Sequence, residues 1–312
     1  MLRLVLRRLA WSVPLLLIAS VVSFVFVALL PGDPARALLG QNATQEQVTA
    51  VREQLGLDQP LWEQYWNWLR GALHGDFGSS LFTHQPVTQL LNDRLEPSLS
   101  LIVGATLVAT LVGVVLGVRG ARRGALGRVV DAVSIVGIAI PDFWLGLMLI
   151  VLFAVQWSLL PPTGYVPFVD DPAGWLTSIV LPVVTLAVPA TAIIAKQTRD
   201  AVSAAFDRGF VRTLRAAGLS DRSITYRHAL KNAAIPILTV VGLVFIGALS
   251  GTVAVESIFA IPGLGRTAVQ ATSSADLPLV QGVVVYFTLI VIVVNLLVDL
   301  AYGYFDPRVR QA

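Results

Sequence analysis

FVRTLRAAGLSDRSITYRHALKNAAIP, residues 210–236, is a polar and basic stretch inside a very apolar chain. Its pattern predicts a helix, a stop at Gly218, and a second helix that begins after a cap at Ser220 or Asp221. Glycine favours the left-handed conformation that ends helices, and Ser or Asp side chains accept the free N–H groups that open them. Pro236 lies where the second helix would enter a membrane. The stretch therefore predicts a rigid, L-shaped element beside a membrane.

The first of these two helices is predicted to carry an apolar stripe. Phe206, Phe210 and Leu214 recur at the i, i+4, i+8 spacing of one helical face. Arg208 and Arg212 fall on the opposite side. An exposed element with one apolar edge suits docking to another protein. The alternative is a basic loop lying on anionic lipid, but such a loop would not need a helix break at one defined glycine.

The composition of the whole chain indicates a polytopic membrane protein. Of 312 residues, 55% are hydrophobic and only 13% are charged. The chain has no cysteine, which excludes disulfides and thiolate metal sites. Nucleic-acid binding is disfavoured, because the distribution of the basic residues is better explained by membrane topology.

Six apolar runs are long enough to cross a bilayer. The first has 22 residues without a charge, about 33 Å of helix at 1.5 Å per residue. Pro141 should break the third run, and Asp142 follows it deep inside the run. Small residues at Gly113 and Gly117, and at Gly247 and Gly251, predict close helix contacts. The six runs are 9–30, 97–118, 132–157, 176–195, 233–255 and 279–302.

The basic residues predict the orientation of these spans. Seventeen of the 22 Lys and Arg residues lie in the N-terminus, 119–128, 196–231 and the C-terminus, on one side of a six-span arrangement. The other side holds five, and the loop 158–175 holds none. Cytoplasmic loops carry the excess of Lys and Arg, so both termini are expected in the cytoplasm.

The polar segment after the first span is expected to be external and helical. Thr44 and Gln47 form a capping box that opens a helix over 45–55, and Gly56 closes it. A second helix is expected over 61–73 and a short third one from Pro86 to Asn92. Two interpretations remain open: a small cap over the membrane bundle, or a surface for an external binding protein. The predicted segments are an N-terminal transmembrane helix (1–30), the external cap (31–94), a five-helix core (95–303) that contains the cytoplasmic loop 196–232, and a cytoplasmic tail (304–312).

Several kinds of chemistry are missing from the sequence. A phosphate-binding P-loop needs a Gly-Lys pair, yet the two lysines, Lys196 and Lys231, follow Ala195 and Leu230. No histidine lies in an apolar run, which argues against intramembrane serine proteolysis, and His74 and His84 have no spaced metal-ligating partners. Transport remains, with the energy supplied by another protein. A non-transporting membrane scaffold also fits the topology.

Asp142 is the deep charged exception in the spans. An ion-driven carrier acting alone would usually show several mid-membrane carboxylates and repeated halves, and neither is evident here. Asp142 therefore has two interpretations: a cap for the second half of a broken helix, or a polar group that lines a passage and faces a substrate amine.

The opening stretch resembles the cytoplasmic EAA loop of ABC importer permeases, in the form found in the peptide/nickel branch. Leu214 and Ala217 depart from that pattern, where the family has Ala and Lys. The resemblance covers nearly the whole chain in order. Its other motifs are Leu-Pro31-Gly-Asp-Pro34-Ala-Arg, Gly56-Leu-Asp-x-Pro60-Leu, His74-Gly-Asp-Phe-Gly78, Pro86-Val87-Thr88, Ile140-Pro141-x-Phe143-Trp144, Pro161-x-x-Gly164-Tyr165, Glu256-Ser-Ile-Phe259-Ala-Ile-Pro262-Gly263-Leu-Gly265-Arg266, and Asn295-Leu-Leu-Val-Asp299-Leu-x-Tyr302 with Asp306-Pro-Arg308.

The resemblance implies a type I ABC importer permease fold in a multi-pass cell-membrane protein. It implies the first of two related permeases of a dipeptide or oligopeptide importer, paired with the second permease, two cytoplasmic ATPases that bind ATP and Mg²⁺, and an external substrate-binding protein. No cofactor is expected in this chain itself. Nickel, glutathione or an oligosaccharide are the alternative substrates within the family.

Two sets of site residues follow. Coupling to an ATPase is expected at Phe206, Phe210, Arg212, Thr213, Leu214, Arg215, Gly218 and Leu219. A translocation pathway or outer gate is expected at Asp142, Glu256, Phe259, Pro262, Gly263, Gly265 and Arg266. Pro262, Gly263 and Gly265 are expected not to continue a helix, and irregular backbone near a membrane is tolerated only where protein or a cavity covers it. A plain connecting turn is the alternative for this second set.

Overall fold

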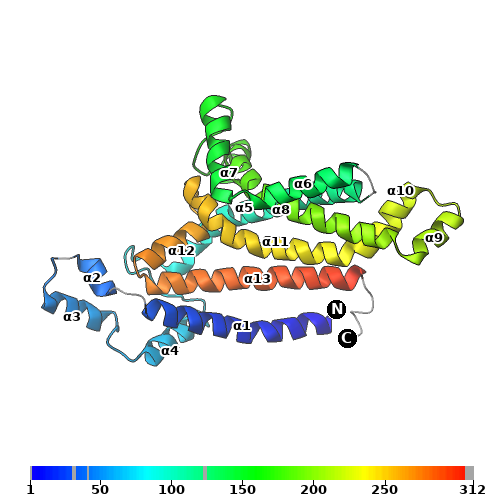
Figure 1. Cartoon of the computed structure of the whole chain (residues 1–312). Helices are drawn as coiled ribbons and strands as arrows, with labels where there is room; N and C mark the ends of the chain where they lie inside the picture. The colour runs from blue at the N-terminus through cyan, green and yellow to red at the C-terminus, as the bar shows by residue number, and fades with distance from the viewer. Residues whose placement is uncertain (1, 30–32, 41, 122–124, 306–312) are drawn as a thin grey trace. The chain divides into compact units, whose positions relative to one another are not determined.

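The computed structural model describes residues 2–29, 33–40, 42–121 and 125–305, and helices make up most of them (Figure 1). Within these ranges no strand forms; an isolated bridge joins Ser79 and Pro86. The prediction of an all-helical protein is confirmed. The elements are α1 Leu2–Ala28, α2 Pro34–Leu39, α3 Gln45–Gln54, α4 Leu61–Ala72, α5 Val87–Gly120, α6 Ala125–Ala139, α7 Asp142–Leu149, the π-helix η1 Ile150–Gln156, α8 Pro172–Phe206, α9 Gly209–Ala216, α10 Asp221–Ser223, the π-helix η2 Ile224–Ala229, α11 Leu230–Ile258, α12 Leu264–Ser273 and α13 Leu277–Phe305.

Some sequence predictions fall on residues outside these ranges. They are the end of the first helix at Pro31, the basic residues Arg122, Arg123, Arg308 and Arg310, and most of the tail 304–312.

The candidate membrane spans correspond to the six predicted runs. In the described part of the chain, five helices are long and apolar enough to cross a bilayer: α1, α5, α8, α10 to α11 as one run, and α13. The sixth run is a pair, α6 with α7 and η1, bent by 94°. Pro141 stands at this bend, as predicted, because proline lacks the N–H that a continuing helix needs and clashes with the preceding turn. The segment α7 turns away from the direction of α6, α8 and α11 (Figure 1).

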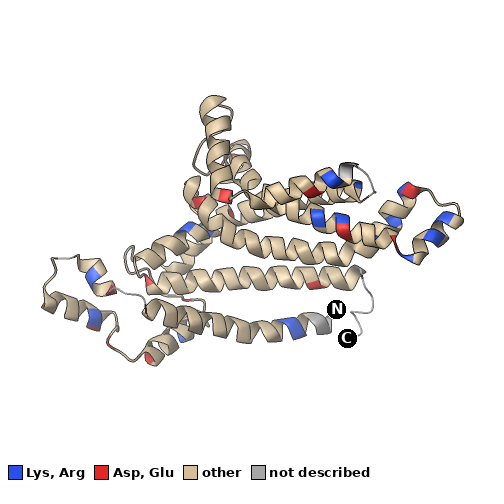
Figure 2. Cartoon of the chain, in the orientation of Figure 1, with Lys and Arg blue, Asp and Glu red and all other residues tan. Residues whose placement is uncertain are grey.

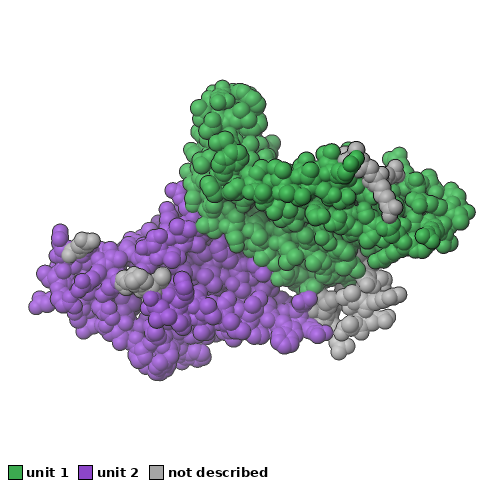
Figure 3. Space-filling view, viewed as in Figure 1, with its two compact units in different colours: residues 1–4, 98–261, 293–312 green, residues 5–97, 262–292 purple. Residues whose placement is uncertain are grey.

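The chain forms two compact units (Figure 3). The first comprises residues 1–4, 98–261 and 293–312, and the second comprises 5–97 and 262–292. In the first unit α8 packs on α6, α7 and α11. Its main apolar core is built from buried residues of α5, α8 and α11, including Leu101, Leu186 and Val255.

One pair of small residues brings helices of the first unit together as predicted, and the other does so in part. A Cβ added at Gly117 would lie 2.5 Å from the Ala195 carbonyl oxygen, so α5 and α8 meet backbone to backbone there. A Cβ at Gly113 would lie 2.9 Å from Ile194 on the same helix. On α11, Gly251 contacts Leu186, but nothing lies within 4 Å of the Cβ position of Gly247. The predicted close contact at Gly247 is therefore wrong.

The second unit contains the external segment and has its own core. Phe77, Val87 and Leu91 pack with Leu264 and Val283. The α3 capping box predicted from Thr44 and Gln47 is present, with both reciprocal hydrogen bonds formed. Gly56 closes the helix with φ +66°. The helices predicted over 45–55 and 61–73 are present as α3 and α4.

One local prediction for the second unit is wrong. The short third helix expected from Pro86 to Asn92 is the beginning of the long helix α5, which continues through Pro97. Proline costs a helix one backbone hydrogen bond, and burial of α5 side chains on both sides of Pro97 offsets that loss. Pro60 is the N-cap of α4. The helix α12 is an element that the sequence did not predict.

Candidate coupling and translocation sites

Gly218 forms the elbow between α9 and α10. Its φ is +79°, in the left-handed region where glycine is favoured. The Leu219 N–H donates to the Leu214 carbonyl at 3.2 Å, and the Gly218 N–H donates to the Arg215 carbonyl at 3.0 Å. This pair of bonds is the Schellman motif that ends a helix and satisfies its last carbonyls. The predicted stop at Gly218 is confirmed.

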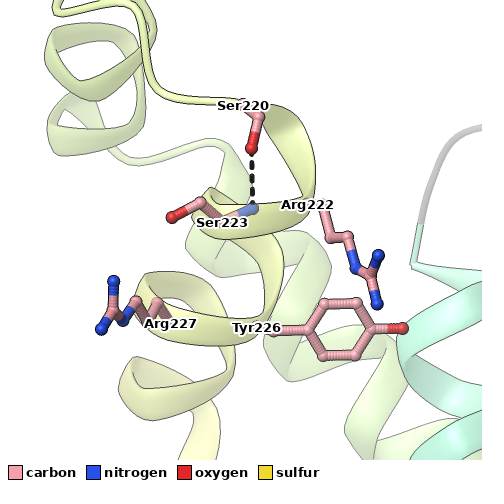
Figure 4. A pocket seen from close by; sticks show the side chains of 5 residues that line it. All are labelled: Ser220, Arg222, Ser223, Tyr226 and Arg227. Atoms are coloured by element: carbon pink, nitrogen blue, oxygen red, sulfur yellow. Dashed lines mark hydrogen bonds between the residues drawn. The ribbon is translucent and has the colours of Figure 1, made fainter.

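Two further interactions hold the elbow. Ser220 caps the second helix, since its hydroxyl accepts the Ser223 N–H at 3.4 Å (Figure 4). Of the two predicted caps, Ser220 is the one used. Asp221 instead pairs with Arg215 across the elbow, with 3.3 Å between Nε and Oδ1. Both partners are exposed, so this pair contributes little to stability.

The predicted apolar stripe on the first arm is wrong. Phe206 is the last residue of α8, and Asp207 and Arg208 separate it from α9, so it does not share a helix with Phe210 and Leu214. Phe210 and Leu214 are half-buried, and Val211 between them is fully buried. The apolar side of α9 therefore packs inward. Its exposed side is polar, with the side chains of Arg212, Thr213 and Arg215 and the backbone of Gly218.

The second arm is rooted in a small apolar cluster. Ala229, Ala233 and Ile237 of η2 and α11 pack with Val202 and Ala205 of α8, and with Val118 and Ala121 from α5 and the residue after it. A π-helical turn over 224–229 joins α10 to α11, and such turns frequently occur at functional sites. Movement of the elbow is therefore connected by packed side chains to the long helices α5, α8 and α11.

Basic side chains surround the elbow. Figure 2 shows Lys and Arg gathered on α9, α10 and the neighbouring ends of α6 and α8. A shallow depression of about 420 Å³ is lined by Ser220, Arg222, Ser223, Tyr226 and Arg227 (Figure 4). Arg222 and Tyr226 lie on one side of this helix and Arg227 on the other (Figure 4). A second cavity, of about 550 Å³, opens inside the angle of the elbow between Arg199, Phe206 and Thr225.

An ion pair that the sequence analysis missed joins α6 to α8 near this elbow. Arg199 pairs with Asp131, and its Nε donates to the Gly120 carbonyl at 3.3 Å. Lys196 lies 4.0 Å from the same carboxylate. Asp131, an acid directly before the apolar run 132–157, was the sequence signal that could have identified this contact.

Part of the predicted outer gate is buried in the first unit. The Ser98 hydroxyl donates to Glu256 Oε1 at 2.6 Å, and Glu256 is fully buried. Phe259 is also buried, and a Cβ added at Gly146 of α7 would lie 3.2 Å from its ring. The Gly164 N–H donates to the Phe259 carbonyl at 2.8 Å, which ties the loop after η1 to the end of α11.

The other predicted gate residues lie in the second unit. Pro262 is half-buried and Gly263 is the N-cap of α12. Gly265 and Arg266 lie in the first turn of α12, so the expectation that Gly265 could not be helical is wrong. The irregular backbone is limited to residues 259–263, where Ala260 has φ +53°.

Asp142 opens α7 at the bend after α6. The N-cap of α7 is Pro141, and no side-chain cap is present, so the structure does not use Asp142 as the predicted cap. Its position in the first turn still suits the positive end of the helix dipole. A Cβ added at Gly251 of α11 would lie 3.3 Å from Asp142 Oδ2 and 3.0 Å from Leu186. The carboxylate therefore lies where α7, α8 and α11 meet.

A buried junction in the second unit was also missed from the sequence. Asp276, which precedes α13, accepts a hydrogen bond from the Ser80 hydroxyl at 2.6 Å and from the Leu81 N–H at 3.3 Å. It is 1% exposed. The contact fastens the segment between α4 and α5 to the start of α13. The sequence separation of about 200 residues left no local signal for this contact.

Two family models match the chain. The model described as binding-protein-dependent transport system inner membrane component matches residues 109–311. The model for the N-terminal part of the corresponding membrane component matches residues 1–102. Together they cover nearly the whole sequence.

Curated relatives match along their full length. The chain is 39% identical over 309 residues to a putative peptide transport system permease protein of Brucella abortus, covering 98% of each chain. It is 41% identical over 308 residues to a probable peptide ABC transporter permease protein of Sinorhizobium fredii, again covering 98% of each. It is 38% identical over 312 residues to the glutathione transport system permease protein GsiC of Salmonella choleraesuis, covering 99% of each.

A solved structure shares the fold. A chain of the MetNI methionine ABC transporter, in an inward-facing conformation, matches with a TM-score of 0.56 and 18% identity. The match covers 70% of this chain and 97% of that one. At this identity the similarity concerns the fold, which is that of an ABC importer permease.

Proposed function

Because the chain belongs to the family of binding-protein-dependent transport system inner membrane components, we propose that it is one of two related permeases in an ATP-driven importer of dipeptides or oligopeptides. Membership makes it a multi-pass inner-membrane transport permease. The names of the relatives in Brucella and Sinorhizobium support a peptide substrate. Glutathione is the second candidate, supported by the Salmonella relative.

The observation that carries the proposal is the elbow at Gly218 in a chain without a P-loop. An ATP-driven permease that has no P-loop of its own needs a partner that hydrolyses ATP. The elbow offers a rigid, exposed, polar surface on α9 and a packed root that reaches α5, α8 and α11. Two cytoplasmic ATPase subunits, which bind ATP and Mg²⁺, would dock on this element in the assembly.

The orientation follows from the same residues. The elbow and the ends of α6 and α8 carry a dense group of basic side chains, and positive-inside topology places such groups in the cytoplasm. Both chain termini would then be cytoplasmic. The helical segment between α1 and α5 would be external, and an external binding protein would deliver the substrate there.

The translocation pathway is proposed to run along the outer part of α11 and the bend before α7. Glu256 and Phe259 would shape the outer gate through their contacts with Ser98 and Gly164. Pro262, Gly263, Gly265 and Arg266 would form the connection from the gate to α12. The second permease would supply the other half of the pathway.

Cysteine cross-linking tests the docking role of α9, because the chain has no native cysteine. Each variant carries one cysteine, at Arg212 or Thr213 on the exposed side of α9. The matched control is Val169→Cys, which lies in the loop after η1 and is 87% exposed. In assembled transporter, a short thiol cross-linker should join the α9 positions, but not position 169, to an ATPase subunit. Absence of any cross-link from α9, in complexes that hydrolyse ATP normally, would contradict the proposal.

A further inference from the structure

One face of α11 differs from the exposed surfaces of the other spans. Gly247, Ser250, Ala254 and Ser257 are all exposed and fall at the spacing of one helical face. All four are small, and two carry hydroxyls. On α6, by contrast, most exposed positions carry large aliphatic side chains, with Ala132 and Ala139 as small exceptions; the large ones are Val129, Val133, Ile135, Val136 and Ile138. Large aliphatic side chains suit lipid, whereas a face of small and hydroxyl side chains suits contact with another helix or with a polar passage.

Asp142 lies at the edge of this face. Its Oδ2 is 3.3 Å from the Cβ position of Gly251, which neighbours Ser250 in the chain and Gly247 one turn away. The side chain is half-buried. Within the part of the chain that the structure describes, it has neither a hydrogen bond nor an ion pair. A carboxylate at this depth without a partner is costly, so such residues generally mark a substrate or ion pathway.

The depth of the two features agrees. Asp142 follows the basic residue Arg128 by 14 positions, which is about 21 Å of helical rise. Gly247 follows the predicted start of its span, Ala233, by the same number of positions and about the same rise. The 3.3 Å approach of Asp142 Oδ2 to the Cβ position of Gly251 also puts the carboxylate at the level of the hydroxyl face.

No basic side chain of the packed elements reaches Asp142. The helix α8 contributes Leu186 beside it, and its nearest basic residue, Lys196, lies about 15 Å further along the helix axis. On α11 the nearest titratable group is Glu256, which faces Ser98. On α6 it is Asp131, which pairs with Arg199. The π-helix η1 has no titratable residue.

We propose that Asp142 is a specificity-determining residue that binds the N-terminal ammonium of the peptide as it passes along the hydroxyl-bearing face of α11. The inference rests on the proposed peptide import and names the part of the substrate that this chain recognises. A single carboxylate beside hydroxyls suits an ammonium, which needs one anionic partner and a few oxygen acceptors. The small residues at 247 and 254 leave room for peptide side chains of different sizes.

The test uses the complete transporter in proteoliposomes, with its second permease, ATPases and binding protein, and labelled dialanine as the probe. Asp142→Asn should lower the initial rate of ATP-dependent uptake about tenfold, since it removes the charge from a charge-assisted hydrogen bond. Asp142→Glu should restore most of the rate. Asp170→Asn, a carboxylate in the exposed loop before α8, is the control and should leave uptake unchanged.

A pH series separates recognition of the ammonium from a structural role. The α-amino group of a peptide loses its proton near pH 8. The ratio of wild-type to Asp142→Asn uptake rates should therefore fall towards one as the pH rises from about 7 to about 9. The ratio cancels the pH dependence of the binding protein, which both assemblies share.

The outcomes distinguish this inference from the proposed function. If wild-type transporter imports no dipeptide, the proposed function fails. If it imports dialanine and Asp142→Asn does so equally well, only the role of Asp142 fails. A loss that Asp142→Glu does not relieve, or a rate ratio that stays constant with pH, would also overturn the role and leave Asp142 as a packing residue.

Discussion

Replacing Gly218 by alanine should weaken coupling without disturbing any contact. Gly218 has φ +79°, and nothing lies within 4 Å of the position that a Cβ would occupy. Gly209, at the start of α9, has equally open surroundings, and its φ does not lie in the left-handed region. Gly218→Ala and Gly209→Ala thus add the same methyl group to the same element. They differ in the backbone conformation that the alanine must adopt.

The expected effect of Gly218→Ala follows from this difference in backbone conformation. An L-residue in the left-handed region costs about 1–2 kcal/mol, because its Cβ approaches the following carbonyl oxygen. A difference of this size changes an equilibrium constant by about 5- to 30-fold. At Gly209, alanine instead favours the first helical position slightly. Gly218→Asn should cost less than alanine, because asparagine adopts this conformation more readily.

The assay measures docking and coupling together. The affinity of purified ATPase subunits for the permease pair is determined in detergent, and peptide-stimulated ATP hydrolysis is determined after reconstitution. Gly218→Ala should weaken docking by at most about 5- to 30-fold, because the strain is present in the undocked elbow too, and it should lower the number of peptides imported per ATP. Gly209→Ala should match wild type in both. Equal docking and coupling for both alanine variants would refute the view that the elbow geometry transmits the energy.

Three further predictions follow from other contacts. Gly117→Ala should destabilise the protein by about 1–3 kcal/mol, since the new Cβ meets the backbone of α8. Gly247→Ala, whose Cβ position is open, should leave the stability unchanged. Equal melting temperatures of the two variants in detergent would contradict the close contact at Gly117. Asp276→Ala should cost about 1–3 kcal/mol, because the buried hydrogen bonds from the Ser80 hydroxyl and the Leu81 N–H are lost. An unchanged thermal unfolding curve would show that the junction carries no stability. A membrane-impermeant maleimide should label Val169→Cys in intact cells and Arg212→Cys only after permeabilisation, and labelling in the reverse order would invert the topology.

The sequence predicted those parts of the fold that depend on local chemistry. The capping box at Thr44, the helix stop at Gly218 and the break at Pro141 each follow from one or two neighbouring residues, and all three are present. The six apolar runs also correspond to the spans, because bilayer thickness sets a minimum length that sequence alone can measure.

The parts that were wrong depend on contacts between distant residues. Helical spacing placed Phe206 on one stripe with Phe210, but the chain breaks at Asp207 and packs α9 with its apolar side inward. Pro97 was expected to start a helix, whereas tertiary packing carries α5 through it. The Asp276 junction joins residues about 200 positions apart. Local patterns contain no information about such partners.

The two candidate sites also differ in how well the sequence could locate them. The elbow could be located from sequence because glycine, serine and a basic loop have local signatures. The polar face of α11 could not, because its four small residues are ordinary in any apolar span. These residues stand out only in the structure, because they are exposed and because Asp142 of α7 lies against the same helix.

The most direct test of the central claim is the uptake of labelled dialanine by proteoliposomes that contain this chain, its second permease, the ATPases and the binding protein. Uptake should require ATP hydrolysis and should stop when the binding protein, or the catalytic activity of the ATPases, is removed. Uptake by this chain alone, driven by an ion gradient without ATP, would contradict it.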